Sequence, residues 1–208
     1  RGGISDLGFE DRCVLISAVS EDPDERPALA LRRSLLPGLL SRFAREHERR
    51  VTGPRERDGG GRRGSESASK HYALFEIGDC YAWSSRPSGM KRVEATRWLG
   101  GLIAQSIQDE KPHSRWTTLF AEVKAVVEAV LRVHLPHTVV AFADARGAGL
   151  INGRAAVVSL SNGSVICRFG EVDPTALAEM SVDWPVAVFE ISLSAVLAFR
   201  GDEVLRGT

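Results

Sequence analysis

The fold is decided by residues 114–170, SRWTTLFAEVKAVVEAVLRVHLPHTVVAFADARGAGLINGRAAVVSLSNGSVICRFG. In its first half, apolar residues recur at spacings of three and four behind Ser114, which is a good helix N-cap. These residues are Trp116, Leu119, Phe120, Val123, Val127, Val130 and Leu131. The spacing predicts an amphipathic helix over 114–134 that ends before Pro136, because proline cannot continue a helix.

The second half of this stretch predicts short strands. Residues 138–143 are β-branched and apolar, and Asn162-Gly163 lies between the apolar runs 155–160 and 164–169, which is the pattern of a hairpin. Asn152-Gly153 suits another turn, because glycine adopts positive φ without a steric cost. A sheet packed on the long helix hides both apolar faces, so we expect this unit to form the core.

The remaining elements follow from periodicity and from the positions of proline and glycine. A second helix is predicted over 90–108, although Gly100-Gly101 disfavours it and indicates that another backbone segment lies close there. Residues 193–199 fit either a strand or a helix. We also predict strands at 12–19, 71–83 and 185–191, a helix through 24–43 that is interrupted at Pro37-Gly38, and a short helix from Asp173-Pro174 to about Met180.

Together these elements predict a single α+β domain with a mainly antiparallel sheet. The two helices 90–108 and 114–134 would pack on one face of the sheet. Residues 1–50 would add a strand and a helix beside this core, residues 51–70 would be a flexible Arg/Gly/Ser-rich linker or insertion, and residues 71–208 would form the main α+β core.

Composition excludes several classes of function. Lys plus Arg and Asp plus Glu are 27 each, so no overall charge favours nucleic acid or an anionic membrane. Three scattered cysteines, without a paired spacing, are typical of reduced thiols in an intracellular, reducing compartment. No apolar run of membrane-spanning length is present, so we predict no membrane partner. A chain that begins at Arg1 fits a processed product or part of a larger polypeptide.

One segment could nevertheless bind nucleic acid. Residues 42–63 carry eight arginines against four acidic residues, and an arginine-glycine segment can follow a phosphate backbone without reading its sequence. The alternative is a solvated insertion, since the linker has no aromatic residues on which bases could stack. The candidate residues are Arg49, Arg50, Arg55, Arg57, Arg62 and Arg63.

A second candidate site centres on a cysteine. Gly78-Asp79-Cys80-Tyr81 resembles the segment around the nucleophile of papain-like cysteine proteases such as the calpain and ovarian-tumour families. The resemblance implies Cys80 as nucleophile and His137 as base, with Asn152 or Asp144 orienting the imidazole. Such a nucleophile lies at a helix N-terminus, however, whereas Cys80 is predicted in or just after a strand. The alternative is an ordinary buried cysteine.

Other chemistry has less support in the sequence. His134 and His137 are separated by Pro136 and have no second ligand pair, and Gly147 and Gly149 lie between predicted strands instead of opening a helix. We therefore predict no metal and no cofactor. The favoured function is a non-catalytic protein-protein interaction or structural module of a larger polypeptide or multi-subunit assembly, with viral and organellar assemblies among the candidates. Its expected partners are other protein subunits; the cysteine hydrolase and the nucleic-acid-binding module are the alternatives.

Overall fold

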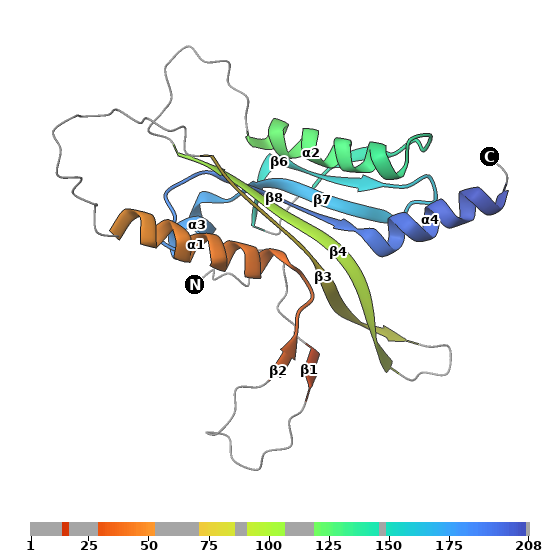
Figure 1. Cartoon of the computed structure of the whole chain (residues 1–208), viewed down its shortest axis with the longest axis horizontal. Coiled ribbons are helices and arrows are strands. Elements are labelled where there is room, and N and C mark those ends of the chain that lie inside the picture. Colours follow the sequence, from red (N-terminus) through yellow and green to blue (C-terminus); the bar gives the residue numbers. More distant parts are fainter. Residues whose placement is uncertain are drawn as a thin grey trace, which may run out of the picture.

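A computed structural model describes residues 14–16, 29–52, 71–85, 91–106, 119–145 and 149–206. Its centre is a six-stranded antiparallel sheet in the order β3-β4-β8-β7-β6-β5, with helices on both faces (Figure 1). The α+β class and the antiparallel sheet predicted from the sequence are therefore confirmed. The strands are β3 (His71–Ser85), β4 (Lys91–Gln105), β5 (Ala141–Asp144), β6 (Leu150–Ser159), β7 (Val165–Val172) and β8 (Val186–Ser192); β1 (Val14–Ile16) pairs separately with β2 (Leu29–Leu31).

Helices α2 (Leu119–His134) and α4 (Leu193–Arg206) pack on one face of the sheet. The buried residues of α2 are Leu119, Val123, Val127 and Leu131, which are members of the predicted apolar stripe. They form one core cluster with residues of β7, β8 and α4, including Phe169, Phe189, Ile191 and Val196. The predicted amphipathic helix is thus confirmed, while its expected cap at Ser114 lies outside the described residues.

Helix α1 (Leu36–Thr52) and the short helix α3 (Pro174–Glu179) cover the opposite face. Leu35, Leu39 and Phe43 pack there against Leu102 and other buried strand residues. The predicted helix through 24–43 is wrong in its first part, because residues 29–31 pair with β1 as a strand. The predicted interruption at Pro37 is also wrong: proline lies in the first turn of α1, where its missing N–H has no helical partner to lose.

The main error of the sequence prediction is the helix over 90–108. Residues 91–105 form β4, which pairs with β3 on one side and with β8 on the other. Its apolar residues imitate a helical pattern because the central part of the strand is buried on both faces: Leu102 belongs to the core under α1, and Ile103 packs on the core under α2. The pair of helices on the α2 face is therefore α2 and α4, and residues 193–199 belong to α4.

Glycines with positive φ lie at two irregular points of the backbone, a turn and a bulge. Gly163 has φ of 82°, and Leu160 N donates to Ser164 O over 2.9 Å, so the predicted hairpin is confirmed. Gly153 also has positive φ, but it lies in a bulge of β6 and not in the predicted turn. The predicted short helix is confirmed as α3, with Asp173 Oδ1 accepting from Thr175 N. The strand predicted at 138–143 begins only at Ala141, because Thr138 N donates to Leu135 O in a turn.

Candidate interaction surface

Among the described residues, no strand pairs with the outer backbone edge of the outermost strand β3 before Asp79. It pairs with β4 in an unbroken register from His71 to Ser85, and it ends the order of the six-stranded sheet. Tyr81 N donates to Arg32 O over 2.8 Å, so the N–H of Tyr81 points away from β4. In an antiparallel pair every second residue points the same way, so the N–H and C=O groups of Ala73, Phe75 and Ile77 also point outward.

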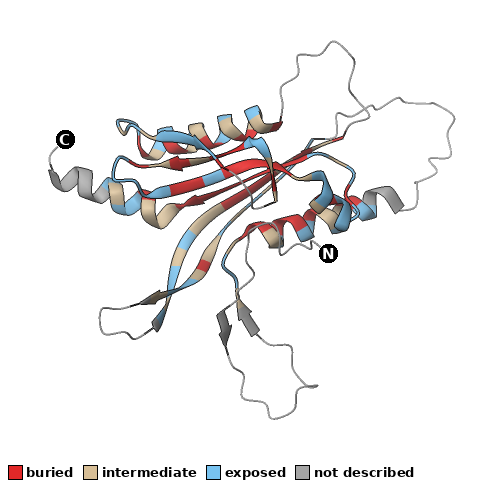
Figure 2. Cartoon of the chain, turned by 180° about the vertical axis from the view of Figure 1, so that it is seen from behind, coloured by how far each residue is buried: buried red, intermediate tan, exposed pale blue. Residues whose placement is uncertain are grey.

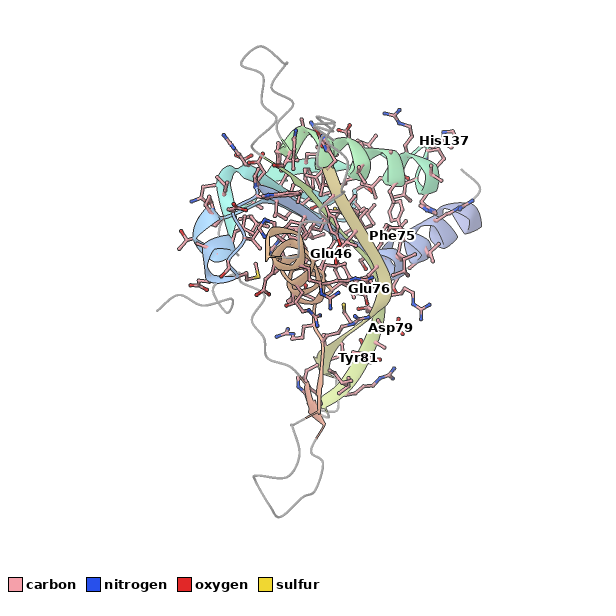
Figure 3. The ribbon with its side chains drawn as sticks, turned by 60° about the vertical axis from the view of Figure 1, so that its left-hand side comes forward. Glu46, Phe75, Glu76, Asp79, Tyr81 and His137 are labelled. Atoms are coloured by element: carbon pink, nitrogen blue, oxygen red, sulfur yellow. The ribbon has the colours of Figure 1, made fainter. Side chains whose placement is uncertain are left out.

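These same residues present apolar side chains to solvent. Phe75 and Ile77 are 75% and 56% exposed. Figure 3 shows Phe75 on the side of β3 that faces away from α1, and Ile77 shares this side because alternate residues of a strand point the same way. Helices α2 and α4 make most of their contacts with the sheet at β4, β7 and β8, and Phe75 and Ile77 of β3 are exposed. Figure 2 shows the contrast between the buried central strands and the more exposed hairpin of β3 and β4. We call Ala73, Phe75, Ile77 and the outer backbone edge of residues 71–77 the β3 surface.

Phe75 is exposed for a structural reason. Its cross-strand neighbour is Gly101, and a Cβ at Gly101 would lie 2.2 Å from the ring of Phe189. The buried Phe189 ring therefore occupies the space that a side chain at position 101 would fill. Phe75 consequently has a glycine as its partner on β4, whereas Ile77 pairs with the half-buried Leu99.

A cluster of arginines and carboxylates closes one end of the β3 surface. Arg32 pairs with Glu76, and its Nε donates to the Asp79 carbonyl oxygen over 3.0 Å. Arg97 binds the Asp79 carboxylate with two hydrogen bonds of 2.7 and 3.1 Å, and this pairing holds the pKa of Asp79 below its ordinary value. The Arg32 guanidinium lies over Gly78, where a Cβ would come within 2.0 Å of Arg32 Nη2. The open part of the edge therefore ends before Asp79.

The residues predicted for a cysteine hydrolase lie apart. Cys80 is 2% exposed on β3, and burial, with a further contribution from Glu190, raises the pKa of its thiol to about 12. His137 is exposed in the turn after α2, far from Asp79 and Tyr81, which flank Cys80 (Figure 3). Asn152 and Asp144 lie on β6 and β5, at the other edge of the sheet. This arrangement provides neither a thiolate nor a base beside it, so it gives the hydrolase hypothesis no support.

The nucleic-acid candidates are described only in part. Arg49 is exposed near the C-terminal end of α1, and the backbone of Arg50 belongs to the same helix. Arg55, Arg57, Arg62 and Arg63 lie outside the described residues. Across the described segments no three residues among His, Cys, Asp and Glu come together as metal ligands, and none of the described helices has the length and apolar character to cross a membrane.

A groove of about 1160 Å³ lies between α1, α3 and the bulge of β6. His47 lines it and is 4% exposed, with Nε2 lying 2.8 Å from Asp183 Oδ1. The buried His47 ring is thus in close contact with the exposed Asp183 carboxylate, and its Nε2 makes no hydrogen bond within the described part of the chain. Most of the lining is apolar, including Leu177, Val182 and Trp184.

Sequence reasoning missed the β3 surface, although a signal was present. The predicted strand 71–83 alternates, but both of its sides carry apolar residues: Tyr72 and Leu74 on one, Phe75 and Ile77 on the other. A strand with two apolar sides needs cover on both. The sequence did not reveal that β3 lies at the edge of the sheet, where α1 covers only one side.

The comparisons with known proteins agree with this fold. Residues 63–193, more than half of the chain, match the family described as phenylalanyl tRNA synthetase beta chain CLM domain. The phenylalanine-tRNA ligase beta subunit of Methanocaldococcus jannaschii is 28% identical over 121 residues, covering 58% of this chain and 19% of the relative. The corresponding subunit of Methanopyrus kandleri is 37% identical over 82 residues, covering 39% of this chain and 14% of the relative.

Two solved structures share the fold. Both are pyrrolysyl-tRNA synthetases of Desulfitobacterium hafniense, with TM-scores of 0.53 and 0.55 at 16% and 15% sequence identity. Each comparison covers 86% of this chain and 52% of the other chain. The chain thus corresponds to only part of each of these proteins, and none of these four comparisons supports a viral or organellar assembly. From the match over residues 63–193, the chain belongs to the family of the phenylalanyl tRNA synthetase beta chain CLM domain.

Proposed function

We propose that this chain is a non-catalytic interaction module of a phenylalanyl-tRNA synthetase β subunit, and that the β3 surface contacts another protein subunit. The observation that carries the proposal is the 75% exposure of Phe75 beside an open strand edge. Large apolar side chains next to unpaired backbone groups mark places where another chain binds. The relatives support it, because both are named as beta subunits and so belong to multi-subunit enzymes.

The site chemistry agrees with a non-catalytic role. The one sequence segment that resembles a catalytic motif places Cys80 in a buried position with a raised pKa. At neutral pH this thiol stays protonated, and the thiolate is the form that acts as a nucleophile. In contrast, the exposed residues of β3 offer contact area without reactive groups. These residues therefore support binding to a partner better than they support catalysis.

The proposal is tested by binding to the other subunit of the synthetase, the α subunit, with the β subunit carrying Phe75→Asp. Aromatic residues at the centre of an interface commonly dominate its affinity, so we expect binding to weaken about tenfold or more. Val139→Asp is the matched control, because Val139 is 84% exposed and precedes β5 at the other edge of the sheet. Titration calorimetry measures both variants. Unchanged affinity of the Phe75→Asp subunit would contradict the proposal.

Binding of tRNA through the arginines of residues 42–63 is a second proposal. It is favoured by the exposure of Arg49 near the end of α1 and by relatives that are named as tRNA ligases. Replacing Arg49 and Arg50 with glutamate should weaken binding of tRNA and flatten its dependence on salt, because fewer phosphates are neutralised. Arg92→Glu, on β4, is the control, since the Arg92 side chain is 55% exposed. An equal loss in the control would show that the effect is only one of net charge.

A further inference from the structure

We propose that the groove between α1, α3 and the bulge of β6 binds a small organic amine, with its ammonium group at His47 and its apolar body along α3. This inference goes beyond the proposed function, because the groove lies on the α1 face of the sheet and Phe75 points away from that face. The groove volume of about 1160 Å³ is sufficient for a small molecule. The proposal rests on a buried nitrogen without a hydrogen bond, an excess of carboxylates and an apolar wall.

The buried nitrogen is Nε2 of His47. This residue is 4% exposed, and a buried polar atom without a partner is costly. A neutral imidazole that carries its proton on Nδ1 offers Nε2 as an acceptor, and Asp183 Oδ1, 2.8 Å away, is an acceptor too. An ammonium group has three donors, so it can bind both atoms at once. The Asp183 side chain is 80% exposed and therefore has room to turn and admit the ammonium group.

The charges along the groove favour a cation. Three carboxylates and two guanidinium groups line it among the described residues. Arg154 Nη1 lies 2.7 Å from Glu171 Oε2, so this pair is neutral as a whole. The other charged lining residues are Arg45, Glu48 and Asp183, of which two are negative. An ammonium group would therefore balance the charge of the groove, whereas Asp183 would repel a carboxylate or a phosphate at the same place.

The wall beside this charged end is apolar. The chain turns sharply after α3, where Ser181 has φ of 56° and Val182 N donates to Leu177 O over 3.0 Å. The turn brings Val182, Asp183 and Trp184 into the lining of the same groove as Leu177. The apolar body of a ligand would remove these apolar side chains from water. A compound with several charges would instead leave some of them unpaired against the apolar wall.

Three compounds with the same six-carbon chain test the proposal on the full chain: hexylamine, hexan-1-ol and sodium hexanoate. Binding is measured near neutral pH by titration calorimetry and by the NMR signals of the His47 ring. We expect hexylamine to bind about tenfold more tightly than hexan-1-ol, because only the amine makes charge-assisted hydrogen bonds, and hexanoate to bind more weakly than either. No binding of hexylamine, equal binding of the amine and the alcohol, or unshifted His47 signals would each overturn the proposal.

Two variants test the role of Asp183. Asp183→Asn should weaken binding of hexylamine about fivefold and leave binding of hexan-1-ol unchanged, since it removes the carboxylate that pairs with the ammonium group. Glu179→Gln is the matched control, because Glu179 is an exposed acidic residue of α3 outside the groove lining. Both positions are exposed, so both variants should fold, and thermal unfolding checks this. Equal weakening in the two variants would reveal an effect of net charge alone and would overturn the site. Phe75→Asp should bind hexylamine normally, so this inference and the proposed function are tested separately.

Discussion

Two opposing effects, burial and hydrogen bonding, act on the carboxylate of one residue, Glu190. Glu190 of β8 is 9% exposed, yet its carboxylate accepts hydrogen bonds from Ser34 Oγ at 2.8 Å and Leu35 N at 2.6 Å. It thereby fixes the residues that lead into α1. Burial raises the pKa of this carboxyl above its ordinary value of 4.5, and the hydrogen bonds from Leu35, Ser34 and Leu36 oppose that rise. Glu190 is therefore both an anchor for α1 and a buried group that prefers to hold its proton.

The raised pKa of Glu190 predicts how its substitution affects stability. The folded protein binds the proton more tightly than the unfolded chain, so the cost of ionising Glu190 appears as pH rises above about 4.5. Glu190→Gln keeps an acceptor oxygen without a charge. We expect the free energy of unfolding of Glu190→Gln, relative to the unmodified chain, to rise between pH 4.5 and 7.5, because only the unmodified chain has to ionise a buried carboxyl over this range. Urea unfolding at both pH values measures it, and a relative decrease would show that the hydrogen bonds outweigh burial.

Single residues also decided what the sequence could and could not predict. Asn162-Gly163 gave the correct hairpin, because a positive φ at glycine is a local property. The same reasoning failed at Asn152-Gly153, where the positive φ serves a bulge within β6. The exposure of Phe75 was beyond local reasoning, since it depends on Phe189 filling the space above Gly101. A residue pattern predicts a conformation, but not which partner lies across the strand.

At the scale of elements, the long amphipathic helix and most strands were predicted, and β4 was not. A helix and a strand buried on both faces show similar runs of apolar residues, and only Gly100-Gly101 distinguished them. In β4 these two glycines lie where both faces are crowded: a Cβ at Gly100 would come within 2.9 Å of Leu35 Cβ, on the α1 face. The glycines therefore let α1 and Phe189 approach opposite faces of one strand.

This crowding predicts the effect of alanine substitutions. In Gly101→Ala the new methyl group must displace the buried ring of Phe189, so we expect a loss of about 1–3 kcal/mol in the free energy of unfolding. Gly38→Ala is the control, because nothing lies within 4 Å of a Cβ at that position of α1. It should raise the free energy of unfolding by about 0.5–1 kcal/mol, as alanine favours the helix. Chemical denaturation compares the two, and equal effects would contradict the proposed contact.

At the scale of the whole molecule, the described residues form two cores on opposite faces of one sheet. The cluster under α1 is built from Leu35, Leu36, Leu39, Leu40 and Phe43 together with strand residues, and the cluster under α2 uses α2, α4 and the other sides of the same strands. The family match covers residues 63–193 and so leaves out α1 and most of α4. The family match therefore includes the sheet and α2. Helix α1, which builds one of the two cores, lies before the matched residues.

Because α1 covers one of the two cores, we predict that the sheet does not fold stably without α1. A chain that begins at residue 53 would expose Leu102, Val186 and Val188, which are at most 1% exposed in the whole chain. Burial of each such side chain contributes about 1.5–3 kcal/mol, so their exposure removes a large part of a domain's net stability. We expect the 53–208 chain to lose its cooperative thermal transition and to bind a hydrophobic dye. A chain of residues 29–208 keeps α1 and its anchor to Glu190, so it should unfold cooperatively. If the 53–208 chain unfolded at the same temperature as the 29–208 chain, α1 would be an accessory element, and the sheet and α2 would suffice as the folding unit.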